Sequence, residues 1–153
     1  MKKVKLLTIV LLTITLFACN SNNALEPTNK NNHVELTKIS TNQAIDQHAS
    51  NEAKELLSKY KEIIKVNAVN TEKELIATVE VRHQARLQLS EIRKKLKNKL
   101  VKNFPDYKVE LSTDKKLVLE VEKVEKQIEE NSYTSKELKK KVKELIELSR
   151  EQT

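Results

Sequence analysis

The chain has 153 residues, a formal net charge of +7 and no glycine or tryptophan. Without glycine, the phosphate-cradling loops of nucleotide-binding proteins are excluded, because those loops require residues that lack a side chain. One cysteine and three histidines are too few to indicate a zinc site of the common kinds, so we expect no metal and no other cofactor.

The first predicted element is a secretory signal. Lys2, Lys3 and Lys5 precede residues 6–17, an apolar run that is interrupted only by threonines. A positive head, a short apolar core and a small residue at the cleavage point are typical of such signals. This run is too short to span a bilayer, which takes about 20 apolar residues, and polar residues follow it at once.

The signal ends at the only cysteine of the chain. The string Leu16-Phe17-Ala18-Cys19 resembles the lipobox of bacterial lipoproteins, in which the thiol receives a diacylglyceryl group and the chain is cut just before it. Loss of residues 1–18 removes three lysines and no acid, which lowers the net charge from +7 to +4. We expect acyl chains such as palmitate to hold Cys19 on the extracytoplasmic face of the cell membrane. The alternatives are a plain signal with an incidental cysteine and an uncleaved apolar helix.

Residues 19–49 are predicted to be a flexible polar tether. They are rich in Asn, Thr, Gln and Ser, and their apolar residues are sparse. A flexible chain of that length reaches roughly 30 Å. His33 and His48 fall in this tether, where a solvated linker residue is favoured over a metal ligand.

A folded domain is predicted over residues 50–131. Ser50 is the expected N-cap of a short amphipathic helix that continues to Tyr60. Residues 63–69 and 75–81 are rich in β-branched residues and roughly alternate, and the polar stretch 70–74 separates them by the length of a turn. This pattern predicts an antiparallel hairpin.

The second half of the domain alternates helix and strand. Apolar residues step by three or four from Leu89 to Phe104, which predicts an amphipathic helix that Pro105 ends. Residues 107–111 alternate and predict a third strand, after which Ser112-Thr113-Asp114 supplies helix caps. Residues 117–128 favour a helix, although residues 117–121 also fit a fourth strand.

A last amphipathic helix, residues 132–153, begins with the capping box Thr134-Ser135-Lys136-Glu137. Together these elements predict the α+β class, with a small three-stranded, mainly antiparallel sheet covered by helices on one face and a C-terminal helix. Because few aromatic residues fall at core positions, we expect an aliphatic core.

Three stretches resemble the YhcN/YlaJ family of sporulation lipoproteins. They are residues 74–81, the corner Phe104-Pro105-Asp106 that ends the basic helix, and residues 107–114. Members of the family have a lipobox, a polar tether, an alternating hairpin strand and strands that end in Ser/Thr-Thr-Asp/Asn, and they often use glycine, which is absent here. The similarity covers about residues 50–130. It implies a lipoprotein of spore-forming bacteria at the spore's inner membrane that affects spore formation, germination or outgrowth. The abundance of Lys, Asn and Ile favours a low-GC Gram-positive source.

A cluster of cations occupies residues 82–102, where Glu91 is the only acid. Such a cluster suits an anionic polymer, lipid head groups or nucleic acid. A solvated helix face is the favoured alternative, and no aromatic residues interleave with the cations to stack on bases. The candidate binding residues are Arg82, Arg86, Arg93, Lys94, Lys95, Lys97, Lys99 and Lys102.

We expect no enzymatic activity. His83 lies between Arg82 and Arg86, where a surface role is favoured, and helix capping explains Ser112, Thr113 and Asp114 without a catalytic triad. The chain is therefore predicted to be a lipid-anchored, non-enzymatic lipoprotein that acts through an unidentified protein partner at the membrane. The alternative is an envelope-binding module that holds anionic polymer or lipid head groups through residues 82–102. Nucleic acid is not an expected partner.

Overall fold

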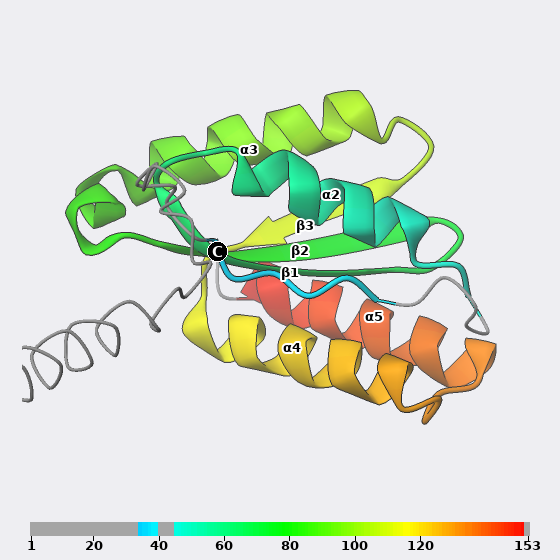
Figure 1. Ribbon diagram of the computed structural model, residues 1–153. Helices are drawn as coiled ribbons and strands as arrows, with labels where there is room; N and C mark the ends of the chain where they lie inside the picture. Colours follow the sequence, from blue (N-terminus) through cyan, green and yellow to red (C-terminus); the bar gives the residue numbers. More distant parts are fainter. Residues whose placement is uncertain (1–33, 40–44, 152–153) are drawn as a thin grey trace, which may run out of the picture. The chain divides into compact units, whose positions relative to one another are not determined.

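The computed structural model describes residues 34–39 and 45–151, which belong to one compact unit (Figure 1). Its sheet has the strand order β1 (Ile63–Asn70), β2 (Glu74–Val81) and β3 (Lys108–Ser112). β1 and β2 pair in antiparallel, whereas β2 and β3 pair in parallel. The predicted α+β class, the hairpin and the third strand are confirmed. The predicted signal and Cys19 lie outside the described residues.

The parallel pairing of β3 follows from the connection that precedes it. After β2 the chain forms the short 3-10 helix η2 (His83–Gln88) and then α3 (Leu89–Asn103), which crosses back over the sheet before β3 begins. A crossover of this length returns the chain to the same end of the sheet, so the next strand runs parallel. The carboxyl ends of β2 and β3 therefore lie at one end of the sheet, a placement that matters below.

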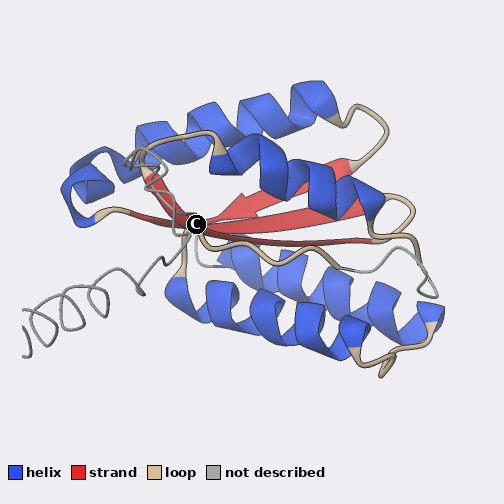
Figure 2. Cartoon of the chain, in the orientation of Figure 1, coloured by secondary structure: helices blue, strands red, loops and turns tan. Residues whose placement is uncertain are grey.

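Helices cover both faces of the sheet, so the expectation of one covered face is wrong (Figure 2). α2 (His48–Ser58) and α3 pack on one face, and α4 (Lys115–Glu129) and α5 (Ser135–Glu151) pack on the other. The reason lies in the central strand β2, where Leu75 and Ile76 are both fully buried but point to opposite sides. A strand that is apolar on both faces needs cover on both.

The predicted caps are confirmed at two of three helices. Asp114 caps α4, and its Oδ1 accepts the Leu117 N–H at 3.0 Å, so residues 115–121 are helical and form no fourth strand. Before α5, Glu137 Oε2 accepts the Thr134 N–H at 2.9 Å and Thr134 Oγ1 accepts the Glu137 N–H at 3.3 Å, as in a capping box. Ser50 is not the N-cap of α2, because that helix begins at His48.

The predicted boundary of the tether at residue 49 is wrong. Residues 34–39, which we call the strap, lie beside β1, and residues 45–49 enter α2. Ile39 is only 2% exposed, and the Asn51 side chain bonds both its backbone N–H (2.9 Å) and its carbonyl (2.7 Å). The predicted C-terminal helix is likewise part of the same fold, since α5 packs into the core over β1 and β2.

The outer edge of β1 is closed group by group. The strap residue Glu35 donates its N–H to the Ile64 carbonyl at 2.8 Å and accepts the Val66 N–H at 2.9 Å. Farther along, the buried Gln47 side chain accepts the Asn70 N–H at 3.1 Å and donates to the Asn70 carbonyl at 2.9 Å. An open edge of this kind is a template for unwanted pairing with another chain, and these contacts remove it.

Between those contacts lies a buried ion pair. Lys54 Nζ on α2 is 2.8 Å from Glu125 Oε1 on α4, with side chains that are 0% and 4% exposed. Lys54 also donates to the Thr37 carbonyl of the strap, and the Glu125 carboxylate accepts the Ala68 N–H of β1 at 3.0 Å. Burial raises the pKa of Glu125, although Lys54 opposes that shift. The pair therefore joins both helix layers, the strap and the edge strand.

We expect Lys54 and Glu125 to be strongly coupled in stability. Lys54→Met or Glu125→Gln alone leaves a buried charge without its partner and should lower the free energy of unfolding by about 3–5 kcal/mol. The double variant should cost less than the sum of the single variants by about 1–3 kcal/mol. Urea unfolding of the four proteins measures this difference.

The matched control is the exposed pair of Lys123 and Glu120, which has the same 2.8 Å separation. Lys123→Met and Glu120→Gln should each change stability by at most about 1 kcal/mol, because exposed pairs contribute little. Simple additivity at Lys54 and Glu125 would contradict the coupling.

Candidate functional site

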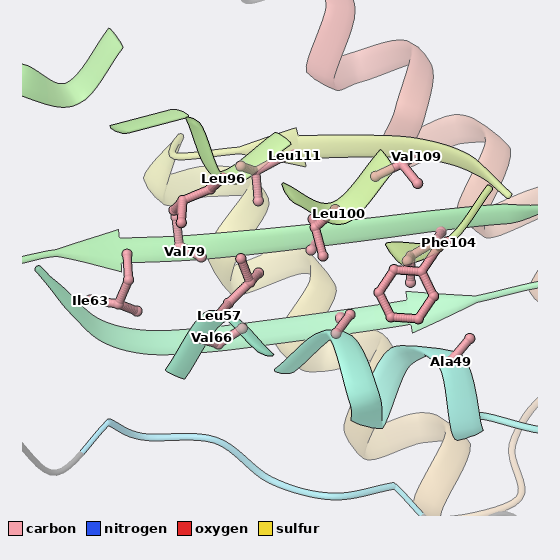
Figure 3. Packing of buried hydrophobic residues seen from close by; sticks show 14 of the residues in the cluster. Ala49, Leu57, Ile63, Val66, Val79, Leu96, Leu100, Phe104, Val109 and Leu111 are labelled. Carbon is pink, nitrogen blue, oxygen red and sulfur yellow. The ribbon is translucent and has the colours of Figure 1, made fainter. Parts of the chain in front are cut away.

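α3 places the predicted basic cluster on the outside of the molecule. Leu96 and Leu100 are fully buried against the sheet, and Phe104 follows them at the end of the helix. Figure 3 shows these side chains gathered over the strands with Val79 and Val109. Because the apolar stripe faces inward at a spacing of four residues, the lysines between its members are directed to the opposite, solvent-facing side.

Three of the eight candidate cations have partners within the fold. Lys95 Nζ lies 5.2 Å from the centre of the Tyr60 ring, a cation–π contact. Lys97 Nζ is 2.9 Å from Glu110 Oε1, and Arg82 Nε donates to the Lys61 carbonyl at 2.7 Å. These three side chains help to hold α3 and the loop after β2 in place, so they are poor choices for a ligand.

The other five cations have no ion-pair partner in the part of the chain that the structure describes. Four are exposed and Arg93 is half-buried. We call this set the basic face; its members are Arg86, Arg93, Lys94, Lys99 and Lys102. Glu91 is the only acid of α3. The structure therefore brings together a smaller set than the sequence suggested, and this set offers charge without a pocket.

Glu110 on β3 is a functional partner that the sequence alone did not identify. Its side chain is nearly buried, and its carboxylate lies 2.9 Å from Lys97 Nζ on α3 and 3.7 Å from Arg150 Nε on α5. The residue ties the two helix layers together at the β3 edge of the sheet. A lone acid in an alternating strand carries no local sign of partners on two distant helices, so only the fold exposes this role.

The residues weighed as catalytic candidates have structural contacts or none. Ser112 Oγ accepts the Asp114 N–H at 3.2 Å, and Asp114 caps α4. His83 begins η2 and is exposed. Ser112 and Asp114 thus serve the turn between β3 and α4.

Two further findings concern the described residues alone. Within residues 34–39 and 45–151, no cluster of three or more His, Cys, Asp and Glu residues has the arrangement of a metal site. In the same part of the chain, no helix combines the length and the apolar character that crossing a bilayer requires.

Comparisons with protein-family models, with curated proteins and with solved structures found no match to this chain. The resemblance to the YhcN/YlaJ lipoproteins therefore stays a prediction from the sequence. What the structure adds is the location of the unpaired cations, and the basic face is the candidate site that the next section considers.

Proposed function

We propose that this protein is a lipid-anchored, non-enzymatic bacterial lipoprotein whose folded domain acts through protein contacts at the extracytoplasmic face of the membrane. The observation that carries the proposal is the position of Cys19, the only cysteine, directly after a signal-like apolar run. A chance cysteine at that one position is a poor explanation, because a lone cysteine in a secreted chain has no intramolecular disulfide partner.

The start of the folded unit is consistent with this arrangement. Residue 34 is the first that the structure describes, and the strap that follows is fastened along β1. Fully extended, the chain from Cys19 to residue 34 spans at most about 50 Å. An anchor at Cys19 would therefore keep the domain close to the bilayer, where its exposed surfaces meet other membrane components.

The biological setting rests on the YhcN/YlaJ resemblance. It implies a role in spore formation, germination or outgrowth, with the forespore or spore inner membrane as the location. The stretches that carry it are residues 74–81 and 107–114, which form β2 and the segment from β3 to the cap of α4.

Lipidation is tested at its acceptor. We expect the wild-type protein to incorporate labelled fatty acid and to remain with membranes, because the Cys19 thiol is the proposed acceptor. Cys19→Ser should give an unprocessed chain without label. Equal labelling of the two proteins, measured by gel autoradiography, would rule out the anchor.

The setting is tested by following a C-terminal fluorescent fusion through growth and sporulation, with membrane fractionation. We expect the signal in the forespore or spore membrane, as the family resemblance implies. Signal in vegetative membranes throughout growth would remove the sporulation role and leave the anchor standing. A fusion to the Cys19→Ser chain is the control for anchor-dependent placement.

A second candidate function follows from the basic face. A module that holds anionic envelope polymer or lipid head groups needs exposed cations without internal partners, and Arg86, Lys94, Lys99 and Lys102 have that character. Binding of this kind weakens steeply as salt concentration rises, because bound counterions are released. Contacts made by apolar packing do not show that dependence.

The basic face can be tested against a control of equal charge. Lys94→Gln/Lys99→Gln/Lys102→Gln should weaken binding to a soluble anionic polymer and flatten its salt dependence, since about one counterion is released for each cation that binds. Lys136→Gln/Lys140→Gln/Lys143→Gln on α5 removes the same charge elsewhere. Equal loss in both triple variants, measured by titration at several salt concentrations, would show that net charge alone is responsible.

A further inference from the structure

One end of the sheet combines four features that the fold did not need to place together. β2 and β3 both finish there, and β1 begins there, because Ile63 is paired with Val81. η2 follows β2 at this end, and α4 follows β3. We call it the carboxyl end of the sheet; in Figure 1 it is the end at which η2 projects beyond the strands.

The strap also enters at the carboxyl end. Glu35 bridges Lys65, and Lys65 is paired with Glu80, one residue before the end of β2. Residue 34, on the side of the chain that leads back to Cys19, is therefore near η2. An anchored domain would have this end close to its point of attachment.

η2 presents an apolar side chain that the fold does not use. Leu87 is 98% exposed, and none of the residues of η2 is buried. A leucine that remains in water contributes nothing to the core. Arg86 beside it is exposed and has no ion-pair partner among the described residues. An exposed leucine flanked by cations is typical of segments that lie at the boundary between lipid head groups and acyl chains.

Charge is distributed unevenly between the two ends of the sheet. The carboxyl end carries Lys59, Lys61, Arg82, Arg86, Lys115 and Lys116 against Glu62, Glu80, Asp114 and Glu151. The opposite end, with the hairpin turn and the turn between α4 and α5, carries Asp46, Glu72, Asp106, Glu129, Glu130 and Glu137 against Lys73, Lys136 and Lys139. A negative surface therefore attracts the first end and repels the second.

We propose that the carboxyl end of the sheet docks on an anionic phospholipid bilayer, with Leu87 inserted at the level of the head groups and Arg86 on the lipid phosphates. The inference rests on the proposed anchor at Cys19, which supplies the bilayer. It adds an orientation: η2 faces the membrane, and the acidic end projects away from it. Near an anionic surface, each cation strengthens association by about fivefold, so this end needs no deep pocket.

The test uses the mature lipidated protein in vesicles of phosphatidylcholine with or without phosphatidylglycerol. Leu87→Cys carries a fluorophore on the docking end, and Glu130→Cys carries the same fluorophore on the opposite end. Both sites are exposed, so labelling leaves the core intact. Lipids that bear a quencher near the head group report contact with the bilayer.

We expect quenching of the probe at residue 87 in vesicles that contain phosphatidylglycerol, and its loss at high salt or without the anionic lipid. The probe at residue 130 should remain unquenched. Adding Arg86→Glu should reduce quenching at residue 87, whereas Lys136→Glu at the far end should leave it unchanged.

The two proposals fail in different ways. If the wild-type chain reacts with a thiol reagent at Cys19 and washes off the vesicles, the anchor is absent and the docking proposal falls with it. If the protein stays on the vesicles but the probes at residues 87 and 130 are equally unquenched, only the docking surface is overturned.

Discussion

The buried ion pair between Lys54 and Glu125 is the contact on which the rest of the fold depends. Removing two charges from water is costly, and their attraction offsets that cost only when the geometry is good and the remaining polar atoms are bonded. Here the strap carbonyl of Thr37 and the Ala68 N–H of β1 supply those bonds. The pair is therefore satisfied only when α2, α4, the strap and the edge strand are all in place, so it favours one arrangement of four separate segments.

The opposite edge of the sheet has a comparable arrangement around Glu110. Its carboxylate lies between Lys97 of α3 and Arg150 of α5, so an acid again joins the two helix layers around an edge strand. Contacts that involve an exposed partner contribute less than buried ones, but they fix the rotation of α3 about its axis. That rotation decides which of its lysines face solvent. The basic face is thus a consequence of the packing of Leu96 and Leu100 on one side and of the pairing of Lys97 on the other.

Local patterns in the sequence predicted the elements, whereas the relations between distant elements could not be predicted from them. Caps at Asp114 and Thr134 depend on residues three positions apart, and those predictions were confirmed. The parallel pairing of β3, the second covered face and the strap depend on contacts between distant segments. Gln47 looks like a linker residue because it is polar, yet it is buried since both its amide groups bond the edge of β1. The basic cluster was predicted as one set, but three of its members are used within the fold.

The topology itself explains why the carboxyl end of the sheet collects positive charge. A parallel crossover brings the ends of β2 and β3 together, so the helices that follow, α3 and α4, both begin at that end. Each helix N-terminus carries a partial positive charge of about half a unit from its unpaired N–H groups, which adds to the lysines and arginines there. In open sheets with parallel strands, ligands commonly bind beyond the carboxyl ends of the strands, where glycine-rich turns approach phosphates. This chain has no glycine and instead presents side-chain cations and Leu87 at the same place, which suits a flat anionic surface better than a single enclosed phosphate.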